Sequence, residues 1–131
     1  MERLASFSIW QKSLDLVKKT YAFTKIFPKE ETFGLVSQLR RASVSVLANT
    51  TEGLSRYMPA DKANRFTIAR GECSEVYALI MASIELKFVS KEVAASTISL
   101  TIEIGNVLSS LIDIHSSKAP NRKIRHASYQ P

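Results

Sequence analysis

The stretch FGLVSQLRRASVSVLANTTEGLSR, from Phe33 to Arg56, decides the fold of this chain. Its apolar residues recur at steps of three, four and seven, which is the spacing of the buried face of a helix. These residues are Leu35, Leu39, Ala42, Val46 and Gly53. The stretch therefore predicts one long helix with a buried apolar stripe.

A row of polar side chains follows the edge of that stripe with the same spacing. Its members are Gln38, Arg41, Ser45, Asn49, Glu52 and Arg56. Arg41 and Glu52 lie three turns apart on this polar row, with Asn49 between them, and we expect them to form a charge-paired edge that can cross to a neighbouring helix or subunit. We expect the polar row to fix the alignment of neighbouring helices or subunits as they pack. The alternative is that its arginine and amide side chains bind the phosphates of RNA or DNA.

The same helix is apolar over more of its circumference than the core of a bundle requires. Val36, Leu47 and Leu54 form a ridge away from the buried stripe, and Val44 lies further round. A helix that is apolar on two sides is usually covered on both, so we expect homo-oligomerisation through this helix. Scattered surface aliphatics, which are common on monomers, are the alternative.

Three more helices are expected around it. The first runs from about Phe7 to Ile26, where Pro28 ends it. Glu30 and Glu31 then open the second helix, because acids favour the positive end of the helix dipole. The apolar face of the first helix is expected to consist of Trp10, Leu14, Val17 and Tyr21.

The third helix is expected from about Lys62 to Lys87 and the fourth from about Ser90 to His115. Asp61 and Ser90 are the expected N-caps. The inward residues of the third helix are Phe66, Ala69, Cys73, Val76, Ile80 and Ile84. Those of the fourth are Leu100, Ile104, Val107, Leu111 and Ile114.

The 131 residues form one domain, and four glycines and four prolines are too few for the turns of an all-β fold. Short connections between long helices predict an all-α, up-down-up-down four-helix bundle over residues 1–115. Residues 116–131 are expected to form a basic, mobile C-terminal tail.

The sequence carries no enzyme motif. It has no glycine-rich phosphate loop and no paired cysteines, so neither catalysis nor a cofactor or metal is expected. The single cysteine, Cys73, lies on an inward stripe, where a packed thiol is expected rather than a nucleophile. The chain also lacks a long apolar run and a signal-peptide h-region, so we expect a cytoplasmic protein without a membrane partner.

The net charge of +6 is concentrated towards the two ends of the chain. A positive surface of this kind attracts phosphate, although a solubilising basic tail is an equal alternative. The candidate nucleic-acid-binding residues are Lys12, Lys18, Lys19 and Lys25 in the first helix and Lys118, Arg122, Lys123 and Arg125 in the tail. Such binding would depend steeply on salt and little on base sequence.

Motifs along the chain resemble those of a known family. They are Phe7, Trp10-Gln11-Lys12, Tyr21 and Phe27-Pro28, then Phe33-Gly34-Leu35, Gln38-Leu39-Arg40-Arg41-Ala42, Ser45, Asn49, Glu52-Gly53 and Arg56, then Ile68-Ala69-Arg70-Gly71 with Glu75. In these residues the chain is similar to the four-helix-bundle proteins encoded in intervening sequences of bacterial 23S ribosomal RNA genes. Accessory proteins of diversity-generating retroelements are related to that family.

The resemblance implies a homopentameric barrel of four-helix bundles with a basic surface. For the retroelement branch it implies binding of RNA or DNA and of a reverse transcriptase, and for the intervening-sequence branch it implies no activity. The chain departs from the family at Leu47, where proline is frequent, and at Thr50-Thr51 and Glu72-Cys73. We therefore expect either a non-enzymatic oligomeric scaffold associated with nucleic acid or a self-assembling structural bundle without a nucleic-acid role.

Overall fold

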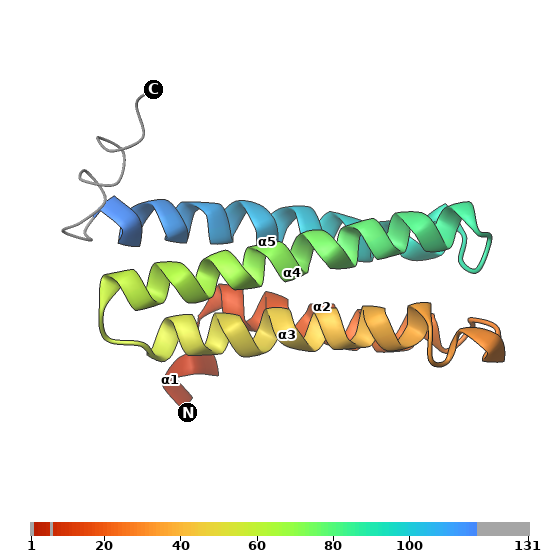
Figure 1. Cartoon of the computed structure of the whole chain (residues 1–131), viewed down its shortest axis with the longest axis horizontal. Helices are drawn as coiled ribbons and strands as arrows, with labels where there is room; N and C mark the ends of the chain where they lie inside the picture. The colour runs from red at the N-terminus through yellow and green to blue at the C-terminus, as the bar shows by residue number, and fades with distance from the viewer. Residues whose placement is uncertain (1, 6, 118–131) are drawn as a thin grey trace, which may run out of the picture.

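The computed structural model describes residues 2–5 and 7–117, and every regular element in them is helical (Figure 1). The elements are a short helix α1 (Glu2–Ala5), α2 (Ser8–Thr24), a 3₁₀ turn η1 (Lys29–Glu31), α3 (Leu35–Ser55), α4 (Pro59–Glu85) and α5 (Lys91–Ser117). The last helix ends two residues beyond the predicted boundary at residue 115. Residues 118–131, and with them most of the predicted tail, lie outside the described part.

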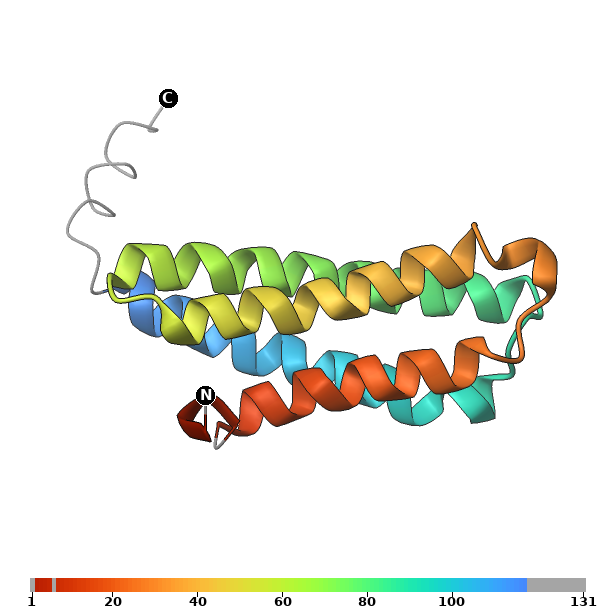
Figure 2. The same cartoon turned by 90° about the horizontal axis from the view of Figure 1, so that it is seen from below.

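The four long helices lie side by side in one bundle, and successive helices run antiparallel (Figures 1 and 2). Helix α3 packs against α2 and α4, and α5 packs against α4 and α2, so each helix has two main neighbours. This arrangement confirms the predicted all-α four-helix bundle. Helix α1 lies at the end of the bundle that also holds the α3–α4 connection.

The helix ends differ from the predictions at two places. Glu30 and Glu31 do not open α3 but form the separate turn η1, and α3 begins at Leu35. Glu31 still satisfies a free backbone donor of α3, because its carboxylate accepts a hydrogen bond of 3.1 Å from the Leu35 N–H. Helix α4 begins at Pro59, so Asp61 lies in its first turn rather than at the N-cap.

At the start of α5 the prediction is confirmed. Ser90 precedes the helix, and its Oγ accepts a hydrogen bond of 3.1 Å from the backbone N–H of Val93. The preceding turn contains Lys87 with φ of 63°, a left-handed conformation at the end of α4.

The core confirms the inward faces predicted for α3 and α4. Buried side chains of these helices include Leu39, Ala42, Val46, Phe66, Ala69, Cys73, Val76 and Ile80. In α5, Leu100 and Ile104 are buried as predicted, while Val107 and Leu111 are partly buried. The prediction that Ile114 points inward is wrong, because Ile114 is 49% exposed. Leu108 and Ile112 are buried instead.

The predicted inward face of α2 is also wrong. Leu14 and Tyr21 are 36% and 39% exposed, and the residues buried in the core are Ile9, Ser13, Leu16, Thr20, Phe23 and Thr24. Two of the three hydroxyl residues bond to their own helix, since Ser13 Oγ donates to Ile9 O at 2.8 Å and Thr24 Oγ1 donates to Thr20 O at 2.7 Å. The third, Thr20, is buried with its Oγ1 unpaired among the described residues. Half of the core face of α2 is therefore polar by residue type.

Among the described residues, α5 alone is long and apolar enough to cross a membrane by length and composition. Core helices of water-soluble bundles meet the same criterion. Here Leu100, Ile104 and Leu108 of α5 are buried against the other helices of the bundle.

Candidate interaction surfaces

The polar row of α3 forms contacts along α3 and ion pairs to α4. Arg41 Nη2 donates to Glu75 Oε2 at 2.6 Å, and Arg41 Nη1 donates to Glu72 Oε2 at 3.3 Å. Gln38 Oε1 accepts a further hydrogen bond of 3.3 Å from Arg41 Nε. Arg41 therefore forms no direct pair with Glu52, and the predicted crossing of the charged edge to a neighbouring helix is confirmed, because the carboxylates that Arg41 reaches lie on α4.

The second half of the row also crosses to α4. Glu52 Oε2 lies 3.0 Å from Arg65 Nε and 3.3 Å from Arg56 Nη2, and Arg65 Nη1 donates to Asn49 Oδ1 at 3.5 Å. Asn49 Nδ2 in turn donates to Ser45 O and Oγ at 3.0 and 3.1 Å. The polar row is thus a ladder between α3 and α4, which supports its packing role within one subunit.

The charges of this ladder shift one another. The hydrogen bond from Arg41 lowers the pKa of Glu75, and burial together with neighbouring Glu75 raises the pKa of Glu72. The hydrogen bond to Glu75 raises the pKa of Arg41 in turn. Arg41 therefore contacts two neighbouring carboxylates of α4 whose pKa values shift in opposite directions, upward for Glu72 and downward for Glu75.

We expect Arg41→Gln to lower the free energy of unfolding by up to about 1 kcal/mol at pH 7, the range for solvent-exposed ion pairs. A carboxylate with a lowered pKa contributes stability above its unfolded pKa and loses it as pH falls through the folded pKa. The difference between wild type and variant should therefore shrink below about pH 4.5, the ordinary value for Glu75. Urea unfolding at pH 7 and pH 3.5 measures this.

Arg70→Gln is the matched control, because Arg70 is also an exposed arginine and its hydrogen bond goes to Ser109 Oγ at 3.4 Å. A control that loses as much stability as Arg41→Gln, with the same pH dependence, would contradict the role given to the ladder.

A second candidate surface covers the outside of α2 and α3. Two contacts tie these antiparallel helices together at their outer edges. Trp10 Nε1 donates to Thr51 Oγ1 at 3.0 Å, and the Arg40 guanidinium lies 4.5 Å from the centre of the Tyr21 ring. Between those two contacts, the helices must run side by side.

Apolar side chains occupy the interval between the two contacts on both helices. They are Trp10, Leu14, Val17 and Tyr21 on α2 and Val44 and Leu47 on α3, which we call the outer strip. Leu14, Tyr21 and Val44 are exposed, and the other three are half-buried. The face predicted to enter the core is therefore the solvent side of α2, next to surplus apolar residues of α3.

The three residues of the predicted apolar ridge on α3 do not lie on one outer surface. Val36 is 8% exposed and belongs to the core of the single chain, and Leu54 packs partly against that core. Leu47 alone of the three lies on the outer strip. The surplus apolar surface of α3 is thus narrower than predicted and is shared with α2.

The predicted basic residues of α2 differ in their surroundings. Lys12 Nζ lies 2.7 Å from Glu103 Oε1 of α5, and Lys19 Nζ lies 3.9 Å from Asp15 Oδ2. Lys18 and Lys25 are exposed and form no ion pair with another described residue. Lys118, Arg122, Lys123 and Arg125 lie outside the described residues.

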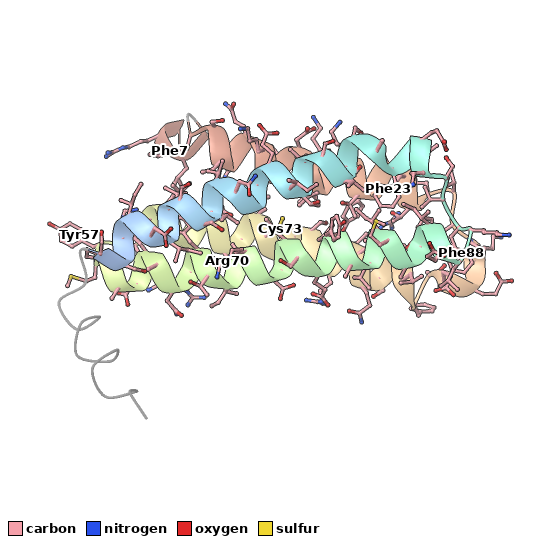
Figure 3. The ribbon with its side chains drawn as sticks, turned by 90° about the horizontal axis from the view of Figure 1, so that it is seen from above. Phe7, Phe23, Tyr57, Arg70, Cys73 and Phe88 are labelled. Carbon is pink, nitrogen blue, oxygen red and sulfur yellow. The ribbon has the colours of Figure 1, made fainter. Side chains whose placement is uncertain are left out.

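Cys73 is buried between α4 and α5, and Figure 3 shows it inside the bundle beside the exposed Arg70. Burial raises the pKa of its thiol to about 11, so the thiol is neutral at pH 7. Its Sγ donates to Thr101 O at 3.2 Å. The environment supports the expected packing role.

Comparisons with known proteins agree with this architecture. The family described as 23S rRNA-intervening sequence protein matches residues 5–110. Among solved structures, the chain is similar to a protein of unknown function from the S23 ribosomal protein family of Bacteroides thetaiotaomicron. The TM-score is 0.71 and the sequence identity 25%, over 79% of this chain and 97% of that chain. The comparison with curated proteins found no match.

Proposed function

We propose that this chain, which belongs to the 23S rRNA-intervening sequence protein family, is a non-enzymatic scaffold that assembles with copies of itself through the outer strip. Family membership by itself gives a small helical protein without an assigned activity. The proposal of self-assembly is supported by one observation: six apolar side chains lie on the outside of α2 and α3, three of them exposed and three covered only in part by the single chain.

The outer strip suits an interface because its residues follow one face of each of two neighbouring helices and its two ends are held in place. Trp10 and Tyr21 are fixed at its two ends by contacts to α3, so binding would order few additional side chains. Tyr and Trp are also the residues that most often dominate binding energy. A ring of five subunits, as the resemblance implies, needs a head-to-tail contact, in which the strip of one subunit meets a different face of the next.

We expect Val44→Glu to shift the protein from oligomer to monomer, because the new carboxylate would be buried without a partner at the contact. Light scattering after size exclusion at micromolar concentration measures the mass. Leu86→Glu is the matched control, since Leu86 is an exposed apolar residue of the α4–α5 turn, away from the strip.

The control should keep the mass of the wild type. A monomeric wild-type protein at the same concentration would contradict self-assembly. An oligomer that Val44→Glu leaves intact would contradict the strip as its interface.

Nucleic-acid binding is the second candidate. The observation that favours it is the exposed pair Lys18, in α2, and Lys25, its C-cap, two helical turns apart. Arg40 of α3 reaches the same end of α2, since its Nε donates to Thr24 Oγ1 at 3.0 Å. Repeated around an oligomer, these cations would form a positive ring with salt-dependent affinity for phosphate.

Filter binding of single-stranded RNA at 50 and 200 mM salt tests this second candidate. Binding at the lower salt that weakens in the Lys18→Gln/Lys25→Gln variant would support it. No binding at the lower salt would leave the structural scaffold as the function.

A further inference from the structure

At the α1 end of the bundle a pocket of about 850 Å³ opens between five segments of the chain. Its walls come from α1, the start of α2, the end of α3 with the α3–α4 connection, α4 and the end of α5. Figure 3 places Phe7 and Tyr57 at this same end. The volume lies within the range of about 300–1,000 Å³ that is typical of small-molecule sites. We call it the end pocket.

The body of the end pocket is apolar. Its lining includes Leu4, Phe7, Ile9, Leu54, Phe66 and Leu111. Phe66 is 1% exposed, and its ring centre lies 5.8 Å from that of His115, which also lines the pocket. Such walls suit an aliphatic chain or a ring rather than a fully polar ligand.

The charged side chains of the lining are cationic. They are Arg3, Arg56 and Lys62, and none of the described residues that line the pocket is acidic. Arg56 also pairs with Glu52, which lies outside the lining, at 3.3 Å between Nη2 and Oε2. Lys62 is fixed at the end of α3, since its Nζ donates to Gly53 O and Leu54 O, each at 3.1 Å. Burial, and after it the charge of Arg3, lowers the pKa of Lys62.

From this combination we infer that the end pocket binds a small amphipathic anion, with a carboxylate or phosphate headgroup near Arg56 and Lys62 and an apolar body against Phe66 and Leu111. The inference is independent of the proposed self-assembly. The chain's own residues 118–131 are a poorer occupant, because they carry four basic residues and no acid and would bring like charge to the site.

Isothermal titration calorimetry of the full chain tests the inference, with decanoate and decyl phosphate below their micellar concentrations as probes. Decanol has the same chain without the charge, and acetate has the charge without the chain. We expect one site per chain and about tenfold tighter binding of an anionic probe than of decanol, the size of one charged hydrogen bond. Acetate should give no measurable binding.

Two variants locate the site. Arg56→Gln should weaken the anionic probe by about tenfold and leave decanol unchanged. Leu111→Trp should block both, because the larger ring fills the apolar body. Arg70→Gln is the control, since Arg70 lies outside the pocket, and circular dichroism verifies that each variant is folded.

The inference is overturned if neither anionic probe binds, if decanol binds as tightly as the anions, or if Arg56→Gln and Leu111→Trp both retain wild-type affinity. A loss of affinity in Arg70→Gln equal to that in Arg56→Gln would also overturn it, because it would indicate unspecific attraction to positive charge.

Discussion

We expect Gly53→Ala to lower the free energy of unfolding by about 1–3 kcal/mol, the cost of overpacking a core. A Cβ at this position would lie 2.5 Å from Cε1 and 2.7 Å from Cδ1 of Phe66, whose ring is buried. Gly53 is part of the helical backbone of α3, so the Phe66 ring, which is 1% exposed, would have to leave its packed position and turn towards the end pocket to make room for the Cβ. Thermal and urea unfolding measure the loss.

Gly71→Ala is the matched control. Gly71 is also a helix-interior glycine, on the exposed side of α4, and a Cβ there would meet no atom within 4 Å. Its replacement should stabilise the protein by about 0.5–1 kcal/mol, the helix preference of alanine over glycine.

A double-mutant cycle isolates the contact. Phe66→Ala alone should cost about 3–5 kcal/mol because it leaves a cavity. In that background Gly53→Ala should reverse its sign and become neutral or slightly stabilising, since the clash is gone and the helix preference remains. If Gly53→Ala costs the same with and without the Phe66 ring, the close approach of α3 to Phe66 is not the reason for the glycine.

We expect Leu16→Ala to lower the free energy of unfolding by about 2–5 kcal/mol, because Leu16 is completely buried. This would be a large fraction of the 5–15 kcal/mol total that is typical of a domain. Leu14→Ala, two residues away on the solvent side of the same helix, should cost about 1 kcal/mol or less. Urea unfolding of both variants measures the difference.

The pair also tests which face of α2 enters the core. Equal losses, or a larger loss for Leu14→Ala, would contradict the orientation of α2. The measurement should be made at two protein concentrations, since a change on the outer strip can alter assembly and thereby the apparent stability.

The sequence predicts α3 and α4 well because their buried positions are occupied by apolar residues at regular steps. On each of these helices a single face carries the apolar residues, so only that face can be predicted to enter the core. The residues are Leu39, Ala42 and Val46 on α3 and Phe66, Cys73 and Ile80 on α4. On α2 the same reasoning selects the wrong face. Ser13, Thr20 and Thr24 occupy core positions, so the outward residues, from Trp10 to Tyr21, form the more apolar stripe.

Of the candidate surfaces, the sequence predicts the membership of the polar row but not its partners. The spacing along α3 places Arg41 and Glu52 on the same edge of that helix. The carboxylates that pair with Arg41 are Glu72 and Glu75 of α4. Sequence spacing could not predict them, because tertiary packing alone determines which residues of two helices meet. The end pocket could not be found from spacing at all, since its lining comes from five segments. One signal was present in the sequence, namely the cations Arg56 and Lys62 on either side of the Met58-Pro59 turn.

The contact between Trp10 and Thr51 has a spectroscopic consequence. Trp10 is the chain's single tryptophan, and its indole lies half-exposed at one end of the outer strip, with Nε1 bonded across to α3. Its emission maximum therefore reports the polarity of that one place. A shift to shorter wavelength on concentrating the unlabelled protein would follow the covering of the strip in real time, and in Val44→Glu the emission should stay constant.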